Sequence, residues 1–236
     1  IGLALTITFL FPQGNEAADP AKVKIAIPKK VLSVGSGPSG SLYVNYTASW
    51  ADMLMKKIEG LNISVVPGGS SQNMRAIHTG DMDFGITATL QTYPGYYGLA
   101  WAKGVKYTKV SSLFPSYSYE GVFFAKANSP INSIHDLNGR TVSFGYAGHP
   151  AGFIQEVELT NDLKFIPISD EDIKKFLEEK PFYAVGTLSP GTYKGMKQPY
   201  KAFQGWNFIA GSPDLPEEFI YQIMKITWEN IGAIHS

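Results

Sequence analysis

Residues 34–43, VGSGPSGSLY, combine glycines with hydroxyl side chains directly before a stretch that has helical spacing. Glycine lets a backbone come close to a ligand, and the N–H groups at the start of a helix attract anions. The serines would add hydroxyl donors to those amides. We therefore expect the loop to bind a small carboxylate. Its candidate ligand-binding residues are Ser36, Ser39, Gly40 and Ser41.

The same loop also matches a dinucleotide-binding pattern, GxGxxG, through Gly35, Gly37 and Gly40. A phosphate loop of the GxxxxGK[ST] type needs a lysine after its last glycine, where this chain has Ser41. The dinucleotide pattern expects an acidic residue about twenty positions later. The sequence in that region is NISVVPGGSS, which has none. A nucleotide-binding enzyme or sensor is therefore the alternative reading of the loop.

Two further polar loops follow apolar runs, GGSSQN at 68–73 and TLQT at 89–92. In the first, the candidate ligand-binding residues are Ser70, Ser71 and Asn73. Either serine could instead cap the helix that follows. Arg75 would pair with a ligand carboxylate or with a neighbouring acid such as Asp81 or Asp83.

The elements around these loops repeat as strand, loop and helix. Apolar runs predict strands that end near Gly35, near Val66 and at Ala88, and helical spacing follows the first two. Three such units in a row predict a parallel sheet with crossover helices, which is an α/β fold. Because ligands bind beyond the carboxyl ends of the strands in open sheets, the three polar loops should converge.

Tyrosines near these loops are candidates for the wall of the site: Tyr43, Tyr93 and Tyr119. The stretch GPSGS at 37–41 lacks the last glycine of the GxSxG nucleophile motif. Neither serine in it has an evident histidine and acid partner. We therefore expect a binding site without catalytic residues, and hence a protein that is not an enzyme.

The composition limits the partners. Twenty basic and twenty acidic residues cancel without a basic block, which argues against nucleic acid. There is no cysteine, and the four histidines lack metal-ligand spacing, so we expect no metal and no cofactor. The apolar run at 1–11, followed by a polar stretch with small residues, is typical of a signal-peptide remnant and favours export.

The second half of the chain predicts another lobe. Residues 109–130 are expected to form two strands, 131–145 a short helix, a turn and a strand at Thr141–Phe144, and 151–169 a helix and a strand. DEDIKKFLEEK predicts a helix capped by an Asp. Two strands and a closing helix that begins at Pro216 would return to the first lobe.

These motifs together resemble the TAXI-type substrate-binding proteins of TRAP transporters. The stretches that carry the resemblance run in family order from about Lys30 to Asn230 and include SVGSGPSGSLY, VVPGGSSQNMRAIHTGDMDFGITATLQT, AGHPAGFIQEVELTNDLKFIPIS and SPDLPEEFIYQIMKITWEN. The resemblance implies a two-lobed periplasmic binding protein fold of the Venus-flytrap type, with the ligand cleft between the lobes. It also implies that Gln91, Thr92 and His149 lie near the cleft, although His149 could simply be a turn residue.

The resemblance further implies a function. Such a protein captures a small organic anion, a dicarboxylate or an acidic amino acid such as glutamate or 2-oxoglutarate. It then passes the ligand to membrane permease subunits of a TRAP transporter. We expect a periplasmic protein that acts as a monomer.

One departure from the family pattern falls after Gly145. Family members continue there with a loop, a long helix and further elements, whereas this chain passes at once to the AGHP segment. Loss of roughly sixty residues would leave sheet edges uncovered, so the second lobe is incomplete or the sequence omits a segment. The expected organisation is an N-terminal extension at 1–29, lobe 1 at 30–120, lobe 2 at 121–188 with this break near 145–146, and return strands with a closing helix at 189–236.

Overall fold

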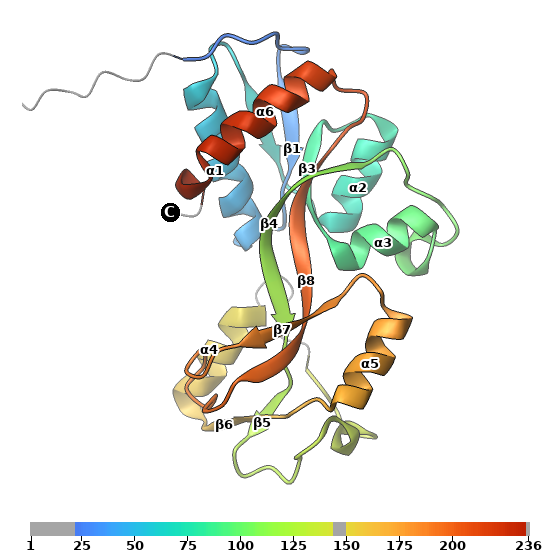
Figure 1. Cartoon of the computed structure of the whole chain (residues 1–236), viewed down its shortest axis with the longest axis vertical. Coiled ribbons are helices and arrows are strands. Elements are labelled where there is room, and N and C mark those ends of the chain that lie inside the picture. The colour runs from blue at the N-terminus through green and yellow to red at the C-terminus, as the bar shows by residue number, and fades with distance from the viewer. Residues whose placement is uncertain (1–21, 144–149, 235–236) are drawn as a thin grey trace, which may run out of the picture.

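The computed structural model describes residues 22–143 and 150–234. Figure 1 shows two lobes that are joined by two long strands, β4 (Ser111–Gly121) and β8 (Tyr200–Gly211). This is the two-lobed α/β architecture that the sequence predicted. Of the helices in the described part of the chain, none is long and apolar enough to cross a membrane.

Lobe 1 contains the three predicted strand–loop–helix units. They are β1 (Leu32–Gly35), α1 (Leu42–Lys57), β2 (Ile63–Val66), α2 (Ser70–Thr79), β3 (Phe84–Ala88) and α3 (Thr89–Tyr97). The sheet order is β2-β1-β3-β8-β4, with β1 parallel to both β2 and β3. The predicted parallel strands are therefore confirmed. A short 3-10 helix, η1 (Ala100–Ala102), follows α3.

Helix α6 (Glu217–Glu229) closes lobe 1 by packing beside α1 on one face of the sheet, and α2 and α3 lie on the other face (Figure 1). The core between α1, α6 and the sheet centres on Trp50, which is fully buried. The indole ring meets Phe84 edge-on at 5.4 Å, and its Nε1 donates to Thr227 Oγ1 at 2.9 Å. A last short 3-10 helix, η3 (Ile231–Ala233), follows α6.

Lobe 2 is smaller. It contains β5 (Phe124–Lys126), η2 (Ile134–Leu137), α4 (Pro150–Thr160), β6 (Leu163–Phe165), α5 (Asp170–Glu179) and β7 (Ala184–Leu188). Strands β5 and β6 form an antiparallel pair, and β7 pairs with the first half of β8. That half of β8 therefore belongs with lobe 2, although the sequence placed 189–236 against lobe 1.

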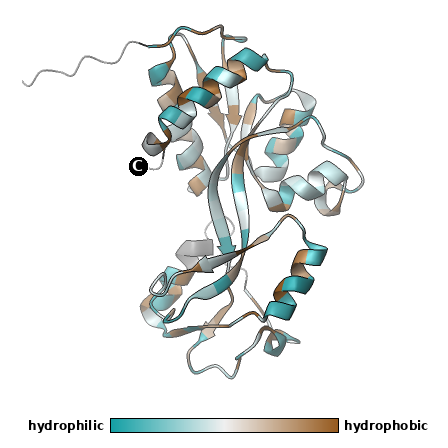
Figure 2. Cartoon of the chain, in the orientation of Figure 1, coloured by the Kyte–Doolittle hydropathy of each residue, from teal (hydrophilic) through white to brown (hydrophobic). Residues whose placement is uncertain are grey.

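Two details of lobe 2 differ from the sequence predictions. Residues 141–143 form no strand, and Phe144 lies outside the described residues. The N-cap of α5 is Ser169 rather than an Asp, because its Oγ accepts from the N–H of Asp172 at 3.1 Å. The acids that follow occupy the first turn, where the helix dipole favours them. Figure 2 shows α5 as a largely hydrophilic helix, in keeping with its position at the surface.

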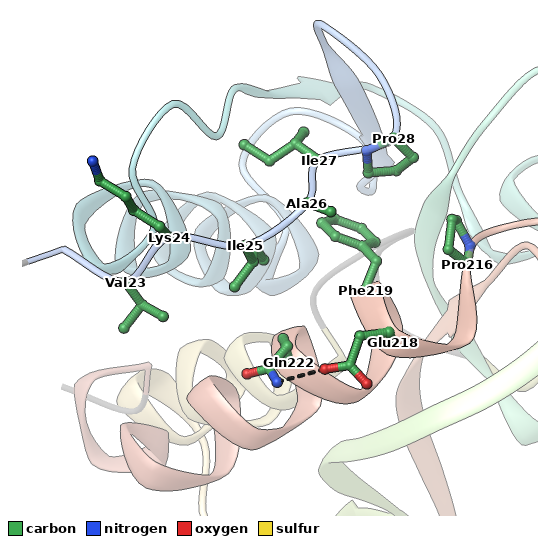
Figure 3. A pocket seen from close by; sticks show the side chains of 10 residues that line it. All are labelled: Val23, Lys24, Ile25, Ala26, Ile27, Pro28, Pro216, Glu218, Phe219 and Gln222. Carbon is green, nitrogen blue, oxygen red and sulfur yellow. Dashed lines mark hydrogen bonds between the residues drawn. The ribbon is translucent and has the colours of Figure 1, made fainter.

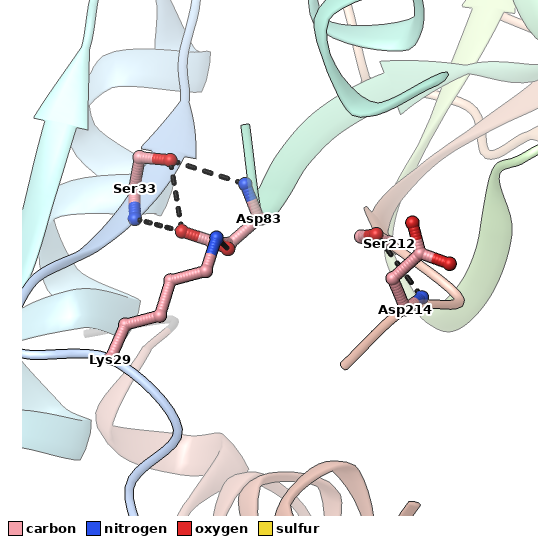
Figure 4. Close-up of polar contacts among 5 residues, drawn as sticks. All are labelled: Lys29, Ser33, Asp83, Ser212 and Asp214. Carbon is pink, nitrogen blue, oxygen red and sulfur yellow. Dashed lines mark hydrogen bonds and ion pairs between the residues drawn. The ribbon is translucent and has the colours of Figure 1, made fainter. Parts of the chain in front are cut away.

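The carboxylate of Asp83 joins the N-terminal segment to the central sheet. Asp83 is buried and accepts from Lys29 Nζ at 2.6 Å and from the N–H of Ser33 at 2.9 Å (Figure 4). The N–H of Ser212 donates to the Asp83 carbonyl at 2.8 Å. Asp83, one of the alternative partners that the sequence offered for Arg75, therefore pairs with Lys29 instead. Arg75 lies over the Trp101 ring instead, with its guanidinium carbon 5.0 Å from the ring centroid.

Candidate ligand-binding site

The three polar loops of lobe 1 meet at the carboxyl ends of β1, β2 and β3. Ser36 Oγ, after β1, donates to the carbonyl of Val66 at the end of β2, at 3.1 Å. Asn73 Nδ2 donates to the carbonyl of Ser36 at 2.9 Å and to the carbonyl of Ile86 in β3 at 2.8 Å. The convergence that the topology predicted is present.

Ser36 and Asn73 hold this edge together from inside. Their exposed fractions are 1% and 0%, so neither has surface to offer a ligand in this conformation. The sequence placed both among the ligand contacts. The Asn73 side chain packs between the backbones of Gly35, Gly68 and Gly85, where an added Cβ would collide with it. The glycines at these positions therefore make room for a buried asparagine.

Ser41 is the N-cap of α1, and its hydroxyl is a buried donor without a partner. The residue is 6% exposed, and Oγ has no hydrogen-bond partner among the described residues. It lies against Gly37, where any side chain would collide with it. An unpaired buried hydroxyl costs about 1–3 kcal/mol, a cost that a bound acceptor would remove.

Three helices begin at this sheet edge without compensation of their N-terminal charge. In α1, α2 and α3 no side-chain cap bonds to the N-terminal amides, and no acid lies in the first turn. By contrast, α5 has a serine cap and three acids in its first turn, and α6 begins with Glu217 and Glu218. Helix amides without side-chain caps and the positive end of the helix dipole are features that attract anions.

A hydrogen-bonded chain joins α1, α2 and the crossing strand β8. Tyr43 Oη donates to Asn207 Oδ1 at 2.6 Å and lies 3.1 Å from Ser70 Oγ. Asn207 Nδ2 donates to the Tyr117 carbonyl in β4 at 3.2 Å. The site edge is therefore bonded to both strands that connect the lobes. The sequence did not indicate Asn207, because the pairing of β8 with β3 decides which of its residues reach Tyr43.

The phenols near the edge are neutral. Burial raises the pKa of Tyr43, and it raises that of Tyr46 to about 12. The pKa of Tyr117 and that of Tyr119 are raised as well, chiefly by burial. A neutral phenol donates a hydrogen bond and adds no negative charge, so the potential of the helix N-termini is not cancelled.

The third loop begins α3. Thr92 Oγ1 donates to the Ala88 carbonyl at 3.0 Å and lies 2.9 Å from Thr87 Oγ1. Gln91 is partly buried, and its carbonyl accepts from Trp101 Nε1 at 3.0 Å. Thr89, which the sequence did not single out, accepts from the N–H of Trp206 at 3.3 Å. This loop is thereby attached to β8.

The remaining candidate ligand-binding residues differ in their exposure and in their place in the chain. Ser39 is exposed, and Gly40 is in the left-handed region at φ 80°, which a side chain would strain. Ser71 is partly exposed in the first turn of α2. His149 lies outside the described residues.

A cavity of about 280 Å³ adjoins the third loop and is lined from both lobes. Lobe 1 contributes residues of α3 and β8, and lobe 2 contributes Phe182. Phe182 stacks on Tyr93 of α3, with ring centroids 4.9 Å apart. The hydroxyl oxygen of Tyr119, the third tyrosine named from the sequence, lies 3.4 Å from Thr89 Oγ1.

A second cavity, of about 380 Å³, lies between the N-terminal segment and α6 (Figure 3). Its lining residues fall within 23–28 and 216–222, at the end of lobe 1 away from lobe 2 (Figure 1). Lobe closure cannot enclose a ligand there, so this cavity is separate from the candidate site. Within the described residues, no group of three or more His, Cys, Asp or Glu could hold a metal ion.

Comparison with known proteins agrees with this geometry. Residues 34–148 and 146–236 match the model of the NMT1-like family, which together is most of the chain. The chain belongs to the NMT1-like family. In this NMT1-like protein the two matched stretches overlap at 146–148, beside the position 145–146 where the sequence predicted a break.

Solved structures of solute-binding proteins are similar to the NMT1-like chain. A TctC solute-binding protein from Polaromonas is 14% identical, with a TM-score of 0.50, over 89% of this chain and 88% of that one. A TRAP periplasmic solute-binding protein from Polaromonas, bound to D-erythronate, is 13% identical with a TM-score of 0.42, over 88% and 80%. A sugar-acid-binding protein from Advenella mimigardefordensis, in complex with galactonate, is 12% identical with a TM-score of 0.43, over 89% and 79%. At these identities the likeness concerns the fold.

Proposed function

We propose that this NMT1-like protein is an exported solute-binding protein, not an enzyme, that captures a small organic anion between its lobes. The observation that carries the proposal is the set of three helix N-termini, α1, α2 and α3, which begin at one sheet edge without side-chain caps or first-turn acids. A carboxylate removed from water needs several donors to replace its hydration. Backbone amides and the Ser41 hydroxyl would supply them.

The narrower part of the proposal concerns the ligand and the partner. The ligand is a carboxylate of the size of glutamate or 2-oxoglutarate, and the chain acts as a monomer that delivers it to permease subunits of a TRAP-type transporter. The TAXI-like motifs support this reading. Ser39, Ser41 and Ser71 are the hydroxyl side chains proposed to contact the anion, with Tyr43 and Ser70 positioned behind them.

Lobe closure around the ligand follows from the two connecting strands. In the proposed division, residues 30–120 form lobe 1, 121–188 form lobe 2, and 189–236 return toward lobe 1, with the first half of β8 still paired with β7 of lobe 2. Strand β4 ends at Gly121, and β8 leaves β7 at Gln204 and meets β3 at Asn207. Bending of β4 near 118–121 and of β8 near 204–207 would then move one lobe against the other.

The alternative function, a nucleotide-binding enzyme or sensor, rests on Gly35, Gly37 and Gly40. Packing explains why positions 35 and 37 are glycines without any phosphate, because a side chain at Gly35 would collide with Asn73 and one at Gly37 with Ser41. Titration of the protein with NAD and with ATP separates the two functions. If neither nucleotide binds, the alternative function is removed.

A thermal-shift screen with organic acids, glutamate and 2-oxoglutarate among them, tests the proposal. At a ligand concentration of 100 times Kd, binding adds about 2.7 kcal/mol of stability, which raises Tm by roughly 5–10 °C in a chain of this size. We expect a saturable rise with at least one acid and no turnover of it. A screen in which no acid raises Tm would remove the support for anion capture.

A further inference from the structure

We propose that the ligand carries a planar apolar group beside its carboxylate, and that this group occupies the aromatic cavity between α3, β8 and lobe 2. The inference rests on the proposed function, because it assigns the second part of the same ligand. Within the small organic anions of the proposed function, it selects short carboxylates that bear a ring.

The cavity wall is aromatic. The residues that line its volume of about 280 Å³ are Thr89, Thr92, Tyr93, Tyr96, Tyr97, Phe182 and Phe208. Tyr96 and Tyr97 remain 44% and 50% exposed, so part of their ring surface is open to a ligand. A planar apolar ligand would cover this ring surface and gain from offset or edge-on contacts with it.

The two threonine hydroxyls in the wall are already used within the protein. The Thr92 hydroxyl donates to the Ala88 carbonyl, and the Thr89 hydroxyl accepts from the N–H of Trp206. A second carboxylate placed in this cavity would lose its hydration and gain few donors, which is costly. The wall therefore favours an apolar group over another charged one.

The cavity adjoins the N-terminus of α3. Thr89 lines the cavity and is also the first residue of α3, one of the three uncapped helices. A carboxylate at the N-terminus of α3 would thus place an attached ring at the cavity. Most small-molecule sites have this arrangement of an apolar wall and a few convergent polar groups.

The cavity also joins the lobes. Phe182 of lobe 2 stacks on Tyr93, and Tyr93 in turn contacts Tyr97 at 4.7 Å between centroids. A ring bound here would touch aromatic side chains of both lobes at once. Binding of the apolar group would therefore favour the closed arrangement of the lobes.

Calorimetric titration with two matched probes, 3-phenylpropanoate and propanoate, tests the inference on the full chain. The two share a carboxylate and differ by a phenyl ring. We expect 3-phenylpropanoate to bind at least about tenfold more tightly than propanoate, because its ring gains a stacking contact and is buried. Tyr93→Ala should reduce 3-phenylpropanoate affinity by about tenfold and leave propanoate affinity unchanged.

Two further variants keep the result interpretable. Phe182→Leu, which retains an apolar side chain, should also lower the affinity for 3-phenylpropanoate and leave the affinity for propanoate unchanged. Tyr221→Ala removes an exposed tyrosine of α6 outside the cavity lining and should change neither affinity. Equal affinities for the two probes, with 2-oxoglutarate or glutamate bound tightly, would overturn the apolar-group inference and leave anion capture intact. Binding of no carboxylate at all would overturn both.

Discussion

Replacement of Ser71 by aspartate is expected to weaken anion binding by roughly 5- to 1,000-fold and to leave the fold at least as stable. Ser71 lies in the first turn of α2, which has neither a side-chain cap nor an acid. A carboxylate there would repel a bound anion at about 4 Å by ~1 to 4 kcal/mol, depending on the local dielectric. The same charge stabilises α2 by about 0.3–1 kcal/mol through its interaction with the helix dipole.

The opposite signs of the two effects make the test specific. Calorimetry measures the affinity, and urea unfolding measures the stability. Ser71→Asn, the uncharged variant of similar size, should retain affinity within about threefold, because the amides of the helix supply most of the interaction. Retained affinity in Ser71→Asp would place the anion elsewhere.

Trp50→Ala is expected to lower the free energy of unfolding by about 3–5 kcal/mol. Trp50 is fully buried, contacts Phe84 and Phe114, and donates to Thr227 Oγ1. Its removal leaves a large cavity and takes away the hydrogen bond that joins α1 to α6. Urea unfolding followed by far-UV circular dichroism measures the change without relying on tryptophan fluorescence.

The matched control for this variant is Trp228→Ala. Trp228 lies on α6 but is 64% exposed, so its removal should change the unfolding free energy by about 0.5 kcal/mol or less. Similar losses from the two variants would mean that the core between α1 and α6 does not depend on Trp50.

The sequence predicted the local elements well where apolar spacing and turn residues agree. Phe84–Ala88 was predicted with the boundaries that the structure has, and Gly80 ends α2 in the left-handed conformation that glycine allows. The four-residue spacing also identified the buried face of α1, with Tyr46, Trp50 and Leu54 in the core. Leu42, the first residue of that series, is exposed because it lies at the helix start.

The site itself was harder to predict from the sequence, because it depends on pairings between distant segments. Asn207 reaches Tyr43 only because β8 crosses from lobe 2 and runs antiparallel to β3. Phe182 meets Tyr93 across the two lobes, which no local pattern indicates. Asn73 looked like a ligand contact because it lies in a polar loop, whereas the glycines around it bury its side chain.

The central claim is that the edge formed by α1, α2 and α3 binds negative charge. Calorimetric titration of the full chain with an organic acid that raises Tm, and then with its primary amide, tests this most directly. The two compounds match in shape and differ in charge. We predict that the acid binds about 100-fold more tightly than the amide, because charge-assisted hydrogen bonds are roughly twice as strong as neutral ones and the helix dipoles attract only the charged group. Equal affinities for acid and amide would contradict it.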